Sequence, residues 1–127
     1  MTDPHISAGV RDLIHGPVAT IAHLELLLAL WRRRPAALRL DAAADEAHVT
    51  SLEGARTCLE DLVTAGLLAA TDDGWRFAPR DSSANARVDE LAAMYTQRPV
   101  TLVRALYARP SRTGWSVAEL FRRGAEG

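Results

Sequence analysis

The stretch from Leu24 to Trp31 constrains the fold more than any other part of the chain, because it is apolar on nearly every face. Its apolar positions recur at helical spacing, and further leucines widen the stripe: Ile21, Leu24, Leu26, Leu27, Leu28, Leu30 and Trp31. A helix with this pattern must be buried on most sides. We therefore expect a central helix, or one shared with a partner subunit. It is predicted to begin near Pro17 and to end at Pro35.

The composition is that of a folded globular protein. The chain has 127 residues, of which 48% are hydrophobic and 24% charged, so we expect a single domain over residues 1–127 with one core. The formal net charge of −1 excludes a global positive field that would steer the chain to nucleic acid. All fifteen basic residues are arginine. We interpret this uniformity as a coding bias rather than as a sign of phosphate binding.

The chain is predicted to be cytoplasmic and not to enter a membrane. Its single cysteine, Cys58, excludes an internal disulfide and fits a reducing compartment. Residues 1–5 lack the charged start and apolar run of a signal peptide. The apolar stretch that ends at Trp31 is far shorter than the roughly 20 residues that span a bilayer.

Two short helices in succession are predicted after Pro35. Residues 36–40 are expected to form a minimal strand, followed by a helix over residues 42–47 with Asp41 as its N-cap. Thr50 and Glu53 match a capping box that opens a second helix, which ends near Gly66. The residues expected to face inward from this helix are Leu52, Ala55, Leu59, Leu62 and Val63. Two helices joined by so few residues indicate a helix-turn-helix.

A β-hairpin is predicted next. The runs 67–70 and 75–78 flank the sequence Thr71-Asp72-Asp73-Gly74, in which Asp-Gly is a strong turn signal. Trp75 and Phe77 would share the inner face of the second strand, which turns Arg76 outward.

The two ends of the chain are predicted to be helical. A short amphipathic turn would carry Val10, Leu13 and Ile14, and a helix opened by Asp81, Ser82 or Ser83 would carry Val88, Leu91, Ala92 and Tyr95. After Arg98-Pro99 an apolar stripe is expected at Val100, Val103, Leu106 and Tyr107, up to Pro110. A second capping box, Ser116 to Glu119, would open a short helix with Leu120 and Phe121 apolar, Arg122 and Arg123 at its end, and Gly124 after it.

Residues Thr50 to Pro79 resemble the core of bacterial winged helix-turn-helix regulators of the MarR-like and ArsR-like groups. The resemblance is carried by the run Leu59 to Leu68, which ends in Ala-Gly-Leu-Leu, and by Asp73-Gly74-Trp75-Arg76-Phe77. With Leu24 to Leu40 it covers roughly half the chain. It implies a mainly α protein with a small β-hairpin, a winged helix-turn-helix core over about 17–79 and a C-terminal helical extension over about 81–124.

The resemblance also implies a function. In that family the second helix of the motif enters the major groove and the wing touches the DNA backbone or minor groove. By position, the recognition helix is residues 51–65 and the wing 67–78, so we expect a transcription regulator that binds double-stranded DNA. The solvent-facing helix residues would include Ser51, Gly54, Arg56, Thr57, Glu60 and Thr64. The predicted DNA-binding residues are Ser51, Gly54, Arg56, Thr57 and Arg76, with Arg56 the main candidate for guanine or phosphate.

The charge of this region favours an alternative. The recognition helix holds one arginine against Glu53, Glu60 and Asp61, and the wing tip is Asp72-Asp73. Carboxylates near phosphate are repulsive, although Glu53 is accounted for by the capping box and Asp-Gly by turn geometry. The alternative is a winged-helix module or adaptor that binds protein and not DNA.

A homodimer is a separate prediction. The segments 24–31 and 100–107 carry more apolar surface than a short motif can cover.

No catalytic residue, cofactor or metal is predicted. The chain has no glycine-rich phosphate loop, no nucleophile elbow and no recognisable carboxylate pair. Its histidines, His5, His15, His23 and His48, show no metal-ligand spacing. Cys58 is interpreted as a small buried residue rather than a redox sensor. Arg32 to Arg34, like Arg122 and Arg123, are interpreted as cations at helix ends rather than phosphate contacts.

Overall fold

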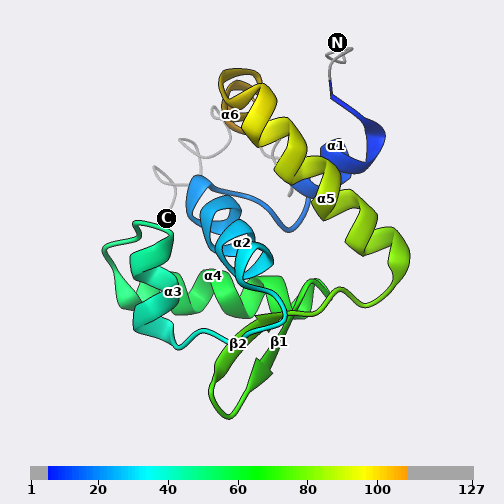
Figure 1. The fold of residues 1–127 in the computed structure, drawn as a ribbon. Coiled ribbons are helices and arrows are strands. Elements are labelled where there is room, and N and C mark those ends of the chain that lie inside the picture. Colours follow the sequence, from blue (N-terminus) through cyan, green and yellow to red (C-terminus); the bar gives the residue numbers. More distant parts are fainter. Residues whose placement is uncertain (1–5, 109–127) are drawn as a thin grey trace, which may run out of the picture.

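The computed structural model describes residues 6–108, which form six helices and one two-stranded antiparallel sheet (Figure 1). In chain order the elements are α1 (Ala8–Ile14), α2 (Ile21–Arg33), α3 (Leu40–Glu46), α4 (Leu52–Thr64), β1 (Leu68–Thr71), β2 (Gly74–Phe77), α5 (Ser82–Gln97) and α6 (Pro99–Tyr107). The expected mainly helical class with a small hairpin is confirmed, and the arrangement is compatible with a winged helix. The predicted helix from Ser116, with Pro110 and residues 122–124, lies outside the described residues.

Helix α2 is the centre of the fold. It lies between α3, α4 and β2 on one side and α5 on the other in Figure 1. Its side chains from His23 to Leu30 are buried except Glu25, which is half-buried. Of the two expectations for this helix, a central position within one chain is the one observed.

The predicted start of α2 at Pro17 is wrong. The helix begins at Ile21 because the Thr20 hydroxyl accepts the His23 backbone N–H and serves as the N-cap. Pro17 instead lies in the turn after α1, where the Val18 N–H donates to the Leu13 carbonyl. The helix ends at Arg33, close to the predicted stop at Pro35.

Helices α3 and α4 form the expected pair, but both N-caps differ from the prediction. Helix α3 begins at Leu40 after Arg39, so Asp41 lies in its first turn and accepts the Ala42 N–H instead of capping the helix. Helix α4 is capped by Ser51, which accepts the Gly54 N–H, and not by Thr50. Adjacent hydroxyl residues offer two possible caps, and the second is the one used.

The interior face of α4 is nearly as predicted. Ala55, Leu59 and Leu62 are fully buried, and Val63 packs against the core. Leu52 was expected inside and is 50% exposed, because the shifted cap makes it the first residue of the helix. The helix ends at Thr64, and Gly66 follows with φ +80°.

The hairpin forms, but Gly74 is not part of its turn. The register pairs Thr71 with Gly74, so the loop residues are Asp72 and Asp73. Gly74 has φ +133°, and a Cβ there would lie 2.0 Å from the Leu38 carbonyl oxygen. Leu38 is the only residue of the expected strand 36–40 that pairs, through an antiparallel bridge to Trp75. Gly74 is therefore needed for the close approach of this third segment.

The predicted terminal helices are present within the described residues. Helix α1 buries Val10, Leu13 and Ile14 and packs against α5, which is capped by Asp81. No helix of the described part is long and apolar enough to cross a membrane.

The expected apolar stripe of α6 is divided between the core and the solvent. Leu102 and Leu106 are the buried residues of this helix. Val100 is 66% and Tyr107 78% exposed, and Val103 is half-buried. The helix is apolar on two faces, so the spacing alone did not determine which face the core would cover.

Candidate nucleic-acid interface

The exposed face of α4 collects the residues predicted for the recognition helix. Each of them is exposed: Ser51, Gly54, Arg56, Thr57, Glu60 and Thr64. They are held outward because the opposite side of α4 packs on α2 and α3. With 13 residues, α4 is about 20 Å long at 1.5 Å rise per residue.

The middle of this face is lined by alternating carboxylates and hydroxyls. Helical periodicity places Glu53, Thr57, Glu60 and Thr64 in one line along the helix. The Thr57 hydroxyl donates to the Glu53 carbonyl, and the Thr64 hydroxyl donates to the Glu60 carbonyl. These hydroxyls thus use their protons within the helix and face an incoming ligand as acceptors, whereas Ser51 accepts the Gly54 N–H and keeps its proton available.

Arg56 connects α4 with the hairpin. Its guanidinium carbon lies 6.0 Å from the centroid of the Trp75 ring, at the outer limit of a cation–π contact. Trp75 is half-buried and Phe77 buried, while Arg76 between them is exposed, as predicted. Arg56 is therefore exposed beside the Trp75 side of the hairpin, and Arg76 is exposed on the opposite face of β2.

The tip of the hairpin is acidic and exposed. Asp72 and Asp73 form the loop, and the Asp73 N–H donates to the Thr71 hydroxyl, which itself donates to the Gly74 carbonyl. Both carboxylates remain exposed. Together with Glu53 and Glu60 they make this surface one of mixed charge.

A buried histidine that the sequence analysis did not single out anchors α4. The His23 Nε2 lies 2.9 Å from Asp61 Oδ2, and its Nδ1 lies 2.7 Å from the Thr20 hydroxyl. In the neutral His23 ring, Nε2 carries the proton and donates it to the Asp61 carboxylate, so Nδ1 accepts a hydrogen bond from the Thr20 hydroxyl. Asp61, counted in the sequence among the free carboxylates of the recognition helix, is thus bound to α2. A histidine among the apolar residues of α2 was the available signal.

Cys58 adjoins the same network. Burial raises the pKa of its thiol, a hydrogen bond with Thr20 opposes that rise, and the nearby Asp61 charge adds to it. Its 9% exposure agrees with the interpretation as a small buried residue. A thiol held protonated in this way is a poor nucleophile.

The arginine cluster at the end of α2 makes contacts within the chain. Arg33 forms a two-point ion pair with Glu46 of α3, at 3.1 and 3.3 Å. This hydrogen-bonded pair raises the pKa of Arg33 and lowers that of Glu46. Arg34 donates to the Trp31 carbonyl and lies over the Trp31 ring. The Arg33–Glu46 pair joins α2 to α3, the Arg34 contacts stay within the end of α2, and both favour the helix-end interpretation over a phosphate site.

His48 occupies the turn between α3 and α4. Its φ of +57° places it in the left-handed region, and its side chain is exposed. Among the described residues no group of three or more His, Cys, Asp or Glu side chains is arranged to hold a metal ion.

Comparison of the chain with protein-family models, with curated proteins and with solved structures gives no significant match.

Proposed function

We propose that the chain is a winged-helix DNA-binding protein, a transcription regulator that inserts α4 into the major groove with the β1–β2 hairpin as its wing. The observation that carries the proposal is the junction of the two elements. Arg56 of α4 lies beside Trp75 of β2, so the exposed outer side of the helix adjoins the hairpin, and Arg76 is exposed on the other face of β2. Arginine is the residue best suited to both guanine edges and phosphate.

The shape of α4 supports this proposal. The major groove is about 12 Å wide and admits one α-helix, and α4 is exposed along its whole outer side. Gly54 lies in the first turn and has no side chain, which permits close approach of the helix backbone to the DNA. Ser51, one turn earlier, offers its hydroxyl proton to a phosphate or a base edge.

The test is fluorescence anisotropy with mixed genomic duplex across a salt series. Each phosphate contact contributes about −0.9 to the slope of log affinity against log salt, so Arg56→Ala should weaken binding and, if Arg56 contacts phosphate, flatten that slope by about one unit. Arg104→Ala is the matched control, since this exposed arginine lies on α6, at the other end of the molecule (Figure 1). Unchanged affinity of Arg56→Ala for every duplex would contradict the assigned contacts.

A second candidate function is protein binding by the same surface. It is favoured by Glu53 and Glu60, which lie in line on α4, and by the exposed Asp72 and Asp73 of the hairpin. Such a surface complements a basic partner. Glu53→Gln with Glu60→Gln separates the two functions, because it should tighten duplex binding in the first case and reduce capture of a basic partner in the second. A pull-down that recovers no stable partner counts against protein binding.

Homodimerisation stays a prediction, now with a narrower basis. The leucines of α2 are buried within the chain. Among the described residues, the prediction of a homodimer therefore rests on the exposed apolar face of α6. Light scattering at tens of micromolar tests it, and a monomeric mass contradicts it.

A further inference from the structure

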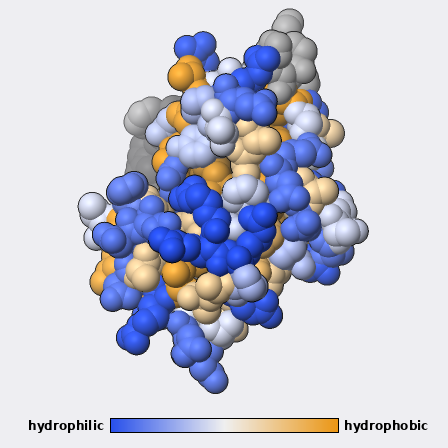
Figure 2. Space-filling model, viewed as in Figure 1, coloured by the Kyte–Doolittle hydropathy of each residue, from blue (hydrophilic) through white to orange (hydrophobic). Residues whose placement is uncertain are grey.

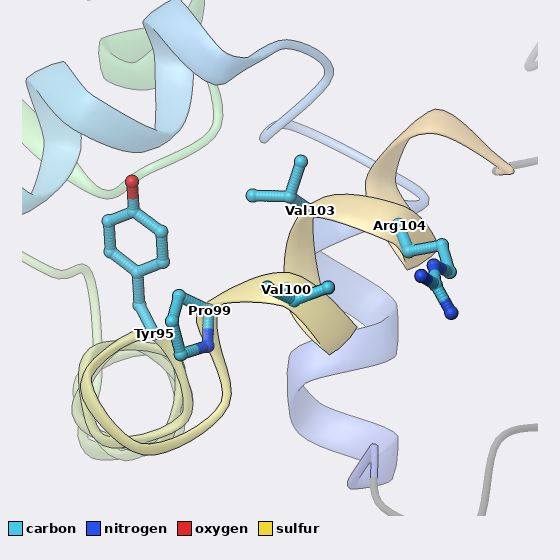
Figure 3. A pocket seen from close by; sticks show the side chains of 5 residues that line it. All are labelled: Tyr95, Pro99, Val100, Val103 and Arg104. Atoms are coloured by element: carbon cyan, nitrogen blue, oxygen red, sulfur yellow. The ribbon is translucent and has the colours of Figure 1, made fainter.

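A shallow apolar groove lies where α5 meets α6. It has a volume of about 380 Å³ and is lined by Tyr95, Pro99, Val100, Val103 and Arg104. Figure 3 shows Tyr95 and Val103 pointing to the same side, toward α2, with Pro99 and Val100 between them and Arg104 turned away. The Tyr95 hydroxyl donates to Glu25 of α2, which fixes the ring as one wall of the groove.

The groove continues into a stripe of uncovered side chains. Val100, Val103 and Tyr107 share one face of α6 by helical spacing. Val100 and Tyr107 are the most exposed of the large hydrophobic residues in the described part. In the view of Figure 2, hydrophobic surface is visible at the α6 end of a largely hydrophilic molecule. Solvated apolar surface of this kind, gathered on one short helix, is a marker of a docking site.

We propose that this groove binds the chain's own segment Ser116–Phe121. The segment begins with a capping-box pattern, Ser116 to Glu119, and spaces Val117, Leu120 and Phe121 as one apolar helical face. A helix of one to two turns is not stable alone in water and needs a surface to pack on. The groove supplies an apolar surface, and the segment supplies an apolar face.

The length of the chain permits this docking. Eight residues, 108–115, separate the end of α6 from Ser116 and reach up to about 26 Å when extended. Helix α6 itself, with nine residues, is only about 14 Å long, so every part of the groove is within reach. A short tether also gives a local concentration in the millimolar range, which makes a weak contact sufficient.

A second copy of the chain fits the same surface less well. A stable interface between proteins takes about 800 Å² from each partner. The outer face of a nine-residue helix offers less, and Arg104 lies beside it. The tethered segment needs no such area, because its association is intramolecular.

The experiment uses the full chain and measures the hydrogen-exchange rates of the α6 amides by NMR, together with contacts from the Phe121 ring to the Val100 methyl groups. The expected result is that these contacts are present and that Phe121→Asp accelerates α6 exchange about tenfold, since it removes one large buried side chain. Val100→Asp, at an exposed position, should have the same effect, and the two changes together should add little. Ala118→Asp is the matched control, which adds the same charge beside the apolar face and should leave the rates unchanged.

Protein concentration distinguishes the occupants. Docking within one chain predicts the same α6 exchange rates at 20 and 500 micromolar, roughly the range over which a weak dimer forms, and a monomeric mass throughout. Exchange that slows with concentration while the mass doubles would assign the groove to a second copy and overturn the proposal. Absence of contacts from Phe121, with no effect of Phe121→Asp, would also overturn it.

Discussion

Replacement of Gly74 by alanine is predicted to detach the segment before α3 from the hairpin. The new Cβ would lie 2.0 Å from the Leu38 carbonyl oxygen and 2.9 Å from the Arg39 Cα, both of them backbone atoms. Neither atom can yield as a flexible side-chain end would. The Leu38–Trp75 bridge must therefore open, with loss of its hydrogen bonds of 2.8 and 2.9 Å.

The magnitude follows from these losses. Two backbone hydrogen bonds contribute about 2 kcal/mol in net terms, and the φ of +133° costs alanine about a further 1–2 kcal/mol. We expect Gly74→Ala to lower the free energy of unfolding by about 3 kcal/mol, which corresponds to a fall in Tm of roughly 10 °C for a chain of this size.

Urea unfolding followed by circular dichroism measures the change, and amide exchange of Leu38 locates it. Asp73→Ala is the control, because this exposed loop residue uses only its backbone N–H and should stay within about 0.5 kcal/mol of the parent. A Gly74→Ala protein with parental stability and a protected Leu38 amide would refute the close-approach argument.

Three further predictions concern groups inside the fold. The hydrogen bond to Glu25 raises the pKa of Tyr95 to about 12. The stability that this hydrogen bond contributes is complete below pH 10 and is lost as the pH rises toward 12. Urea unfolding of Tyr95→Phe over a pH series should lack this loss. Cys58 should react with a thiol reagent far more slowly in the native than in the urea-unfolded protein, since burial raises its pKa; equal rates would contradict its burial. Asp61→Ala leaves the buried His23 Nε2 unpaired and should cost about 1–3 kcal/mol, measured by urea unfolding; no loss would show that the pair is dispensable.

The elements that sequence analysis predicted well are those with local signals. The apolar spacing of Ala55, Leu59 and Leu62 identified the buried face of α4, and Gly66 identified its end, because both depend on residues within a few turns. The exposure of Arg56 followed from the helical periodicity of α4, and that of Arg76 from the alternation of side chains along β2.

The features that it missed depend on contacts between distant segments. The Asp-Gly pair indicated a turn, but Gly74 is required by the backbone of Leu38, which the sequence does not place beside it. His23 and Asp61 lie 38 positions apart, and their pairing depends on how α2 crosses α4. Helix α6 is apolar on two faces, so its orientation depended on what packs against Leu102 and was not encoded in its spacing.

The packing of α1 on α5 has a consequence for synthesis on the ribosome. Residues 8–14 emerge well before α5, the helix that packs on them, which ends only at Gln97, after α2, α3, α4 and the hairpin are complete. At about 5–20 residues per second, Val10, Leu13 and Ile14 are without their α5 partner for several seconds in every nascent chain. This short apolar segment is therefore accessible to chaperones during translation until α5 has been synthesised and packs on it.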